Sequence, residues 1–423
     1  MALNIDVSKM EITHKDRVMN AHYTPNELHV GIDVGSLNHS VAISDGNGKM
    51  IREFDITHTQ KGFDKFFTII AEESKQRDAT ASIAMEGYNG WARPLDGFIL
   101  KQGYKLYNVN NVKLARFKEI FPAAAKTDAI DARKIVELFS LQKHLPIAKK
   151  VLQEIQVSDS INKQLKKLSR RRKQLVEERM IITNRMGADL QAEAPDLKGL
   201  ASCVDDLWFL RFVTLRQDMR LLIKVHKSTI EKIPRIRKNH IDTITAWQQN
   251  ASFTDAIDYI ASMFYDDALR ILELKQKIKD IEKQIDKLIP SSKIASILIT
   301  IPGFATVSAG TLAGEIGTLN RFESEGSLAL YLGMTNLDNS SGKTKGSKRN
   351  MATNRHAKKA MINATMQHSR NTEESSVYLK KKISQGKKYQ QAIRSLGRHL
   401  VRVIWSMIQQ ERSYEIRNKS LVY

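Results

Sequence analysis

The residues from 28 to 109 alternate between short apolar runs with a two-residue period and longer stretches with a helical period. Three β-type runs come first, and the turn Asp45-Gly-Asn-Gly-Lys49 between the second and third favours a hairpin. Helical and β-type stretches then alternate, which gives the order β-β-β-α-β-α-β-α. The predicted strands span 28–35, 38–44, 50–57, 81–85 and 105–109, and the predicted helices span 61–76, 91–101 and a segment that opens near 126. This order predicts a mixed α/β domain, in which helices pack on a mixed sheet.

The remainder of the chain has a helical pattern, and the whole divides into four predicted parts. Residues 1–27 have mixed charge without periodicity and are interpreted as an N-terminal arm. The mixed α/β domain occupies 28–145. A long helical or coiled-coil region with a helical insertion occupies 146–293, and a mainly α-helical C-terminal domain occupies 294–423. A chain of 423 residues is long enough for two or three such domains.

Four carboxylates fall at positions that this fold would bring together. Asp33 is near the end of the first predicted strand and Glu86 ends the fourth, so they meet at one sheet edge if those strands are neighbours. Asp128 and Asp131 would project from one face of a first helical turn. Taken alone, these two are better explained as acids that cap the helix. Four carboxylates together need a cation, and oxygen ligands favour Mg²⁺ or Mn²⁺.

The charge balance favours a polyanionic partner. Lys and Arg together number 67 against 46 acidic residues, which gives a net charge of +21 and a pI near 9.8. Such an excess is typical of proteins that bind nucleic acid. No apolar run approaches the roughly 18 residues of a membrane-spanning helix, and no secretory signal is evident. The single cysteine, Cys203, fits a reducing compartment. These features predict a soluble cytoplasmic protein.

The positive charge is concentrated in two segments. Residues 28–145 carry 16 basic and 14 acidic side chains, whereas 149–185 carry 11 and 4, and 343–402 carry 16 and 2. The two basic segments are interpreted as nucleic-acid-binding regions. Their candidate binding residues are Arg170, Arg171, Arg172, Lys173, Lys343, Lys345, Lys348, Arg349, Arg355, Lys358 and Lys359.

Two stretches in the middle of the chain carry seams, that is, rows of apolar residues at the spacing of a helix–helix interface. In the first, at 155–190, apolar residues recur every seven positions, but the partner position includes Arg172 and Arg179. Either these arginines face nucleic acid or the helix packs along only part of its length. The second seam runs from Ile271 to Leu288 at three-four spacing. Pairing of the two helices within one chain and dimerisation are equally compatible with these seams.

A Pro302-Gly303 turn lies between two helical stretches at the start of the C-terminal domain. It looks like a helix-hairpin-helix element, in which the first N–H groups of the following helix bind phosphate. Gly303 is therefore a further candidate nucleic-acid-binding residue. A simple turn that joins two helices explains the residues nearly as well.

The tetrad and two longer motifs resemble a known family. With Asp33 and Glu86 upstream, the run Ala-Lys-Thr-Asp-Ala-Ile-Asp-Ala-Arg at 125–133 resembles the ribonuclease-H-like (RuvC-like) domain of DEDD insertion-sequence transposases, a family that includes the Piv-type DNA invertases. Downstream, Tyr-x-Gly at 331–333, then Ser-Gly, a basic loop and a basic helix resemble the family's second signature. The chain departs from that signature at Asn336, where proline is usual, and at 351–354, which replace a glycine-asparagine pair.

The resemblance implies that Ser341, the serine directly before the glycine, is the catalytic nucleophile, although Ser340 is adjacent and could be confused with it. A serine that attacks a phosphodiester forms a covalent phosphoserine, which conserves the bond energy for rejoining. The resemblance further implies a transposase with divalent metal at the tetrad, active on donor and target DNA as a homodimer or homotetramer. It also implies an element-encoded bridge RNA and a prokaryotic cytoplasm or nucleoid.

Three alternatives remain open at this stage. A RuvC-like junction nuclease would use the tetrad and metal without serine catalysis. A site-specific invertase of the same family would use both sites for a different outcome. A non-catalytic nucleic-acid-binding protein would need neither site.

Overall fold

The computed structural model describes residues 27–415 except 89, 91, 110–113, 116–127, 145–150, 255–256, 343–345, 349 and 352. The chain forms two compact units, an N-terminal unit that ends at Val157 and a C-terminal unit that begins at Ser158. The predicted arm at 1–27 lies outside the described residues apart from Glu27, the first residue of the first strand. Each unit is described by itself.

The N-terminal unit is built on a six-stranded mixed sheet with the order β3-β2-β1-β4-β5-β6. Strands β3, β2 and β1 are antiparallel, β1, β4 and β5 are parallel, and β6 returns antiparallel to β5. The strands are β1 (Glu27–Val34), β2 (Asn38–Asp45), β3 (Met50–Thr57), β4 (Thr80–Glu86), β5 (Lys105–Val109) and β6 (Leu152–Glu154). The mixed α/β fold class is confirmed, and the first five strands lie within a residue or two of the predicted ranges.

The sixth strand was missed by the sequence pattern and lies beyond residue 145, the predicted end of this domain. With three residues, β6 is too short to show a two-residue period. It joins the sheet because Tyr107, Asn108 and Val109 of β5 offer it a free antiparallel edge. The sheet therefore extends into the segment that was assigned to the helical region.

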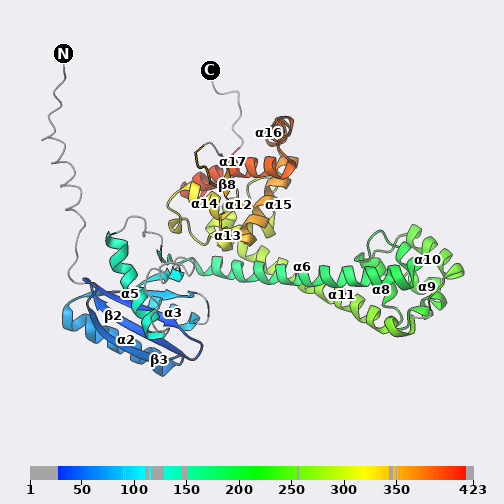
Figure 1. Cartoon of the computed structure of the whole chain (residues 1–423). Helices are drawn as coiled ribbons and strands as arrows, with labels where there is room; N and C mark the ends of the chain where they lie inside the picture. The colour runs from blue at the N-terminus through cyan, green and yellow to red at the C-terminus, as the bar shows by residue number, and fades with distance from the viewer. Residues whose placement is uncertain are drawn as a thin grey trace, which may run out of the picture. The chain divides into compact units, whose positions relative to one another are not determined.

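Helices cover both faces of the sheet (Figure 1). Helices α2 (Gln60–Arg77) and α3 (Arg93–Lys101) pack on one face, where Phe63 and Phe66 join the buried strand residues. Helix α5 (Asp128–His144) packs on the other face. Thr59 caps α2 by accepting a hydrogen bond from the N–H of Gly62, which fixes where that helix begins.

In its described residues the C-terminal unit is helical apart from one short hairpin, and two long helices run through it. These are α6 (Ser160–Glu193) and α11 (Ile257–Leu288), which lie side by side in Figure 1. Arg172 of α6 pairs with Glu282 and Glu178 pairs with Arg270, so residue numbers rise along one helix as they fall along the other. The helices are antiparallel, and pairing within one chain is confirmed for these seams.

The two seam arginines have a role that neither of the predicted alternatives described. Arg172 Nη2 lies 2.6 Å from Glu282 Oε1, and Arg179 Nε lies 3.6 Å from Asp205 Oδ2. Each arginine therefore keeps its charge at the seam by pairing with a carboxylate from elsewhere in the chain.

The sequence did not indicate a role for the helical segment 197–260. In the structure, residues 195–250 build a helical cap at one end of the long helices. The cap contains α7 (Pro195–Gly199), α8 (Leu207–Val213), η2 (Met219–Lys224), α9 (Lys227–Ile230) and α10 (Lys238–Asn250). Its core includes Trp208, Phe209, Phe212, Trp247 and Phe264, packed against apolar residues of α6 and α11. These aromatic side chains make the cap part of the hydrophobic core of the unit.

The remaining helices form a second core around the other end of α6 and α11, which contribute Leu165 and Ile285. The elements are η3 (Ile289–Ser291), α12 (Lys293–Leu298), α13 (Thr306–Ile316), η4 (Leu319–Arg321), α14 (Glu325–Tyr331), the hairpin β7 (Leu337–Asp338) and β8 (Ser347–Lys348), α15 (Arg355–Asn371), α16 (Glu373–Ser384) and α17 (Tyr389–Gln409). The predicted mainly helical C-terminal region is confirmed. Within the part of the chain that is described, no helix is both long and apolar enough to cross a membrane.

The Pro302-Gly303 turn joins α12 to α13 and packs against α15. Gly303 has a φ of +86°, and a Cβ at this position would lie 2.3 Å from the backbone nitrogen of His368. His368 Nδ1 is 2.7 Å from the Pro302 carbonyl oxygen. Glycine is therefore required here by backbone conformation and by the close approach of α15.

Candidate active site

Asp33 and Glu86 lie beside each other at one edge of the sheet. Strands β1 and β4 are parallel neighbours, and Ile32 pairs with Met85 in their register. Asp33 and Glu86 are the next residue of each strand, so they occupy equivalent positions at the carboxyl ends. The condition stated from the sequence, that the first and fourth strands are neighbours, is met.

Asp33 projects from the face of the sheet that helix α5 covers. A Cβ on Gly31 would lie only 2.4 Å from the carbonyl oxygen of Ala132 in α5. His29, on the same face of β1, stacks on Phe139 of α5 with ring centroids 4.4 Å apart. Because side chains alternate along a strand, residues 29, 31 and 33 share this face.

Glu86 projects from the same face, by the corresponding argument on β4. Ala84, two residues earlier, is fully buried and packs with Ile135 and Leu138 of α5. Alternation along β4 then places Glu86 on the α5 side of the sheet. Two carboxylates from adjacent strands therefore face the helix that carries the other two.

Asp128 and Asp131 occupy the first turn of α5. Asp128 is exposed, whereas Asp131 is only 8% exposed and has Lys134 Nζ 3.9 Å from its Oδ1. The residue after Asp131, Ala132, packs with Ala42 of β2 against the sheet. This tight contact of small residues seats the first turn of α5 on the sheet.

Arg133 fixes the same turn from the other side. Its guanidinium forms a two-pronged ion pair with Glu53 of β3. The hydrogen bonds from Arg133 hold the pKa of Glu53 below its ordinary value. The arginine at the end of the Asp-Ala-Ile-Asp-Ala-Arg run therefore ties α5 to the edge strand.

The donor chemistry of this site fits a hard divalent cation, because all four side chains supply carboxylate oxygens. Asp33 and Glu86 share one sheet edge and one face, and α5 lies on that face. Among the described residues, no three acidic, histidine or cysteine side chains are grouped closely enough to hold a metal ion together. The fold thus gives the four acids a common location on the sheet without bringing their oxygens to ligand distance.

The two candidate serines lie in the C-terminal unit, at the tip of the β7–β8 hairpin. Ser340 Oγ donates a hydrogen bond to Asp338 Oδ1 at 2.7 Å. Ser341 is exposed, and its hydroxyl makes no hydrogen bond within the described part of the chain. Gly342 follows with a φ of +55°, which favours glycine at that turn. The geometry therefore distinguishes two serines that the sequence alone did not.

The base of the segment that carries the hairpin is closed by hydrogen bonds. The N–H of Asn354 donates to the carbonyl oxygen of Tyr331 at 2.9 Å, and Thr353 Oγ1 donates to the carbonyl oxygen of Leu330 at 3.0 Å. Asn354 also caps α15 by accepting hydrogen bonds from the N–H groups of His356 and Ala357. Residues from both ends of the second signature thus hold the serine segment at its base.

Glu315 is buried at the centre of these hydrogen bonds, and the sequence did not identify it as a functional residue. Its side chain is 0% exposed, and Arg170 donates to both of its oxygens, at 2.7 and 3.0 Å. Asn354 Nδ2 donates to Glu315 Oε2 at 2.8 Å and to the Tyr331 hydroxyl at 2.7 Å. Lys166 Nζ lies 3.9 Å away. Burial alone would raise the pKa of Glu315, but these donors and charges outweigh it, and the pKa is lowered.

Several predicted nucleic-acid-binding residues form ion pairs within the chain. Arg170 pairs with Glu315, Arg172 with Glu282, and Lys173 with Glu177 at 3.2 Å. Arg171 is exposed. In the second basic segment Lys348, Arg355 and Lys359 are exposed and Lys358 is half-buried, whereas Lys343, Lys345 and Arg349 lie outside the described residues.

Comparison with known proteins finds family matches over the two regions that contain these candidate sites. Residues 30–195 match a DEDD family model described as transposase, and residues 295–380 match the model of the Transposase IS116/IS110/IS902 family. The first match contains the carboxylate tetrad and the second contains both candidate serines. The class is therefore that of an enzyme that cleaves and joins DNA. The chain belongs to the IS110/IS116/IS900 family of insertion-sequence transposases.

Relatives of similar length support this assignment. A 42 kDa protein of insertion element IS900 from Mycobacterium paratuberculosis is 22% identical over 91% of this chain and 96% of its own length. A 43.6 kDa protein of IS110 from Streptomyces coelicolor is 24% identical over 74% of this chain and 78% of its own. Among solved structures, Thermus thermophilus RuvC in complex with a Holliday junction substrate is 10% identical, covers 31% of this chain and all of its own, and gives a TM-score of 0.23.

Proposed function

We propose that this transposase cuts and rejoins DNA through the Ser341 hydroxyl. The single observation that supports this most is the hairpin itself: an exposed serine before a glycine, on a segment whose two ends are clamped around Glu315. A nucleophile must reach the phosphorus, which Ser341 can do from the tip of β7–β8. Ser340 is held back by its bond to Asp338.

The chemistry is a pair of transesterifications. Ser341 Oγ forms a bond to phosphorus, the bond from phosphorus to a sugar oxygen breaks, and the proton from the serine is balanced by protonation of the leaving oxygen. In the second step a DNA hydroxyl attacks the phosphoserine, which restores the serine and joins the strands. The number of phosphodiester bonds is conserved, so no nucleotide cofactor is required.

Asp33, Glu86, Asp128 and Asp131 are proposed to hold Mg²⁺ or Mn²⁺ in the N-terminal unit. When bound, a divalent ion would polarise the phosphodiester and neutralise charge on its oxygens. The pairing of Arg133 with Glu53 of β3 supports this role by tying the first turns of α5 to the sheet.

The partners of the reaction belong to the same proposal. Donor and target DNA are the substrates, an element-encoded bridge RNA selects them by base pairing, and a homodimer or homotetramer in the prokaryotic cytoplasm carries out the reaction. Base pairing would then read sequence while the protein reads backbone. The net charge of +21 supports a nucleic-acid partner of this kind.

The decisive experiment traps the covalent intermediate. End-labelled DNA carrying the element's ends is incubated with the protein, its RNA and Mg²⁺, and the adduct is resolved on a denaturing gel. Wild-type protein and Ser340→Ala should form the adduct, and Ser341→Ala should not. An adduct that persists in Ser341→Ala would exclude this nucleophile, and metal-dependent cleavage unchanged by that substitution would favour the junction nuclease.

A further inference from the structure

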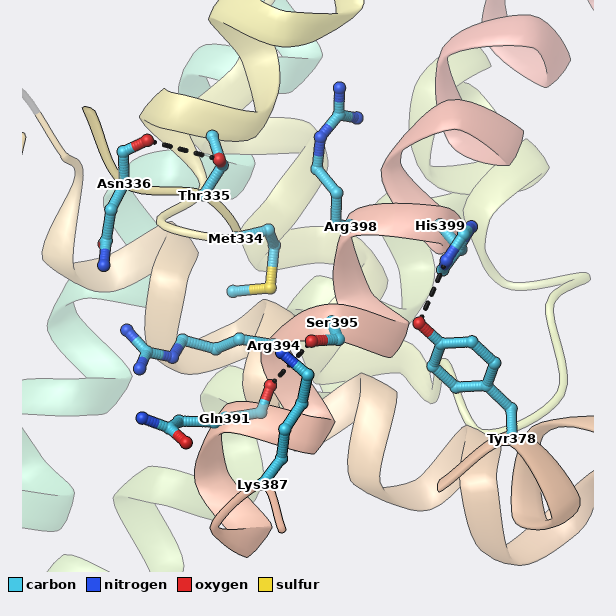
Figure 2. A pocket seen from close by; sticks show the side chains of 10 residues that line it. All are labelled: Met334, Thr335, Asn336, Tyr378, Lys387, Gln391, Arg394, Ser395, Arg398 and His399. Carbon is cyan, nitrogen blue, oxygen red and sulfur yellow. Dashed lines mark hydrogen bonds between the residues drawn. The ribbon is translucent and has the colours of Figure 1, made fainter. Parts of the chain in front are cut away.

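A basic cavity of about 470 Å³ lies between the end of α14 and the helices α16 and α17 (Figure 2). Its lining includes Lys387, Arg394, Arg398 and His399, and none of its ten lining residues is acidic. Gln391, Asn336 and Ser395 add side-chain amides and a hydroxyl. A cavity rich in cations and neutral hydrogen-bond donors, without a carboxylate, is suited to an anion.

Two of the cations carry charge that the described chain does not neutralise. Arg394 and Lys387 have no carboxylate partner among the described residues, and in Figure 2 the Lys387 side chain points toward Arg394. Two cations without a carboxylate partner at one cavity favour the binding of an anion there. Neither residue belongs to the basic groups that the sequence motifs identified.

Arg398, by contrast, is held by an internal partner. Its Nη2 donates to Glu325 Oε1 at 2.7 Å, and Nη1 bonds the second oxygen of the same carboxylate. Glu325 is the first residue of α14, so this pair fixes α14 to α17 at the edge of the cavity. Arg398 therefore shapes the cavity, while Arg394 and Lys387 supply its net charge.

Met334, which lines the cavity, packs closely against α17 because of a glycine inside that helix. A Cβ on Gly397 would lie 2.4 Å from Met334 Sδ, so only glycine lets Met334 seat against the helix. Met334 is 3% exposed.

The pKa of His399 reflects both its burial and the positive charges near the cavity. Burial lowers its pKa, and Arg402, Arg398 and Lys382 lower it further. Its Nε2 lies 3.0 Å from the Tyr378 hydroxyl, which fixes the ring at the cavity wall. Both effects favour the neutral form of His399, so the net positive charge of the cavity comes from Arg394 and Lys387.

The cavity is connected to the candidate nucleophile through Asn336. Asn336 lines the cavity, and its Nδ2 donates to Ser347 Oγ on β8 over 3.5 Å. Ser347 pairs with Asp338 of β7 in the hairpin that carries Ser341. A group bound in the cavity would lie at the base of that hairpin.

We infer that this cavity binds a backbone phosphate of the DNA strand that is presented to Ser341. Arg394 and Lys387 contact the phosphate oxygens, and the Gln391 side-chain amide can add a neutral hydrogen bond, whereas the Ser395 hydroxyl already donates to the Gln391 carbonyl oxygen. The inference rests on the proposed function in one respect only, the identity of the bound strand as the one presented to Ser341. Phosphate binding itself does not require that Ser341 be the nucleophile.

The test measures binding without cleavage, in full-length protein carrying Ser341→Ala. Fluorescent DNA with the element's ends is titrated at several salt concentrations, and log Kd is plotted against log salt. Adding Lys387→Ala and Arg394→Ala should weaken binding at least about fivefold and reduce the slope by about 1, as expected for one lost phosphate contact. Arg394→Lys should retain most of the affinity, because the charge remains.

A matched control removes two lysines from the other end of the C-terminal unit. Lys232→Ala with Lys238→Ala changes the net charge equally, on α9–α10, and should leave the affinity and slope near those of the parent. Equal losses in both double variants, or none in the cavity variant, would overturn the inference. Circular dichroism confirms that each variant is folded.

Inorganic phosphate distinguishes the two sources of this anion. Free phosphate at millimolar concentration should compete only weakly with DNA, because a strand gains further contacts along its backbone. If phosphate alone binds the parent tightly while the cavity variant binds DNA normally, the cavity holds a free anion and the inference is wrong.

Discussion

Glu315 carries a fully buried carboxylate whose charge is balanced by Arg170, Lys166 and the amide of Asn354. A buried charge with one partner removed is costly, whereas a complete set of donors makes it stabilising. Its side chain joins α6 to Asn354, the N-cap of α15, and its backbone carbonyl accepts a hydrogen bond from Tyr331 of α14, so Glu315 connects three elements around the base of the serine segment.

The charge of Glu315 should be visible in the pH dependence of stability. Its pKa in the folded protein is lowered from the ordinary value of 4.5. Between the folded and unfolded pKa values the unfolded chain binds more protons, so this contribution is complete above about pH 4.5 and is lost as the pH falls through the folded-state value. Urea unfolding from pH 6 to pH 3 should show a flatter acid slope for Glu315→Gln.

The same substitution should destabilise the C-terminal unit at pH 7 by about 2 kcal/mol, because charged hydrogen bonds are replaced by neutral ones. Glu231→Gln, an exposed position in the cap, is the control and should change neither the acid slope nor the stability. If Glu315→Gln keeps the wild-type acid slope, another carboxylate is responsible for it.

At the residue scale, the sequence predicted where functional side chains lie better than it predicted which side chains they pair with. Asp33 and Glu86 could be placed because strand ends follow from local periodicity. The ion pairs of Arg170 and Arg172 could not be predicted, because their partners, Glu315 and Glu282, lie more than a hundred positions away. Pairing over such distances depends on the tertiary fold, and a single sequence does not encode it in any local pattern.

Among the elements, α5 depends on one position of the sheet. Gly31 allows the Ala132 carbonyl to approach β1 closely, and this contact fixes the height of the helix that carries Asp128 and Asp131. The small residues Ala42 and Ala84 continue the same surface on β2 and β4. Because these residues are so small, α5 packs close to the sheet. This close packing places the acids of α5 beside the acids of the strands.

Gly31→Ala should consequently impair the carboxylate site while the sheet stays folded. The new methyl group pushes α5 away from β1, so metal-dependent DNA cleavage should fall at least tenfold. Far-UV circular dichroism should change little. Gly97→Ala in α3 is the matched control, because no atom lies within 4 Å of its Cβ, and it should cleave normally. Normal cleavage by Gly31→Ala would show that α5 need not sit so close.

The elements themselves were predictable where they are long. The strands and helices of the N-terminal unit follow from alternation, and the two long helices from their seams. The three-residue β6 was not predicted, and the sequence of the cap helices between 195 and 250 indicated no function. Short elements depend on neighbours to form, so their local sequence contains too little signal.

For the whole molecule, the proposed metal role predicts separable effects on binding and cleavage. Removing divalent ions with EDTA should abolish DNA cleavage and adduct formation, while salt-sensitive DNA binding persists. Added Mg²⁺ should restore cleavage and raise the Tm of the wild-type protein, because an ion that binds only the folded state stabilises it.

Asp131→Ala should remove both responses to Mg²⁺ and leave DNA affinity unchanged. Its control is Asp45→Ala, in the β2–β3 turn, which should respond to Mg²⁺ as the wild type does, with at most a small loss of stability from the turn hydrogen bonds. Cleavage that continues in excess chelator would contradict a metal role for the tetrad.

The C-terminal unit has two hydrophobic cores that share one pair of helices. Leu165 and Ile285 belong to the core around α13, and Leu175 and Leu274 belong to the core of the cap. A 34-residue helix such as α6 is about 51 Å long, so the cores are centred on different stretches of the same two rods. Neither core can unfold without disrupting the helices that support the other core. Heating should therefore unfold the cap and the serine-bearing core as one cooperative transition.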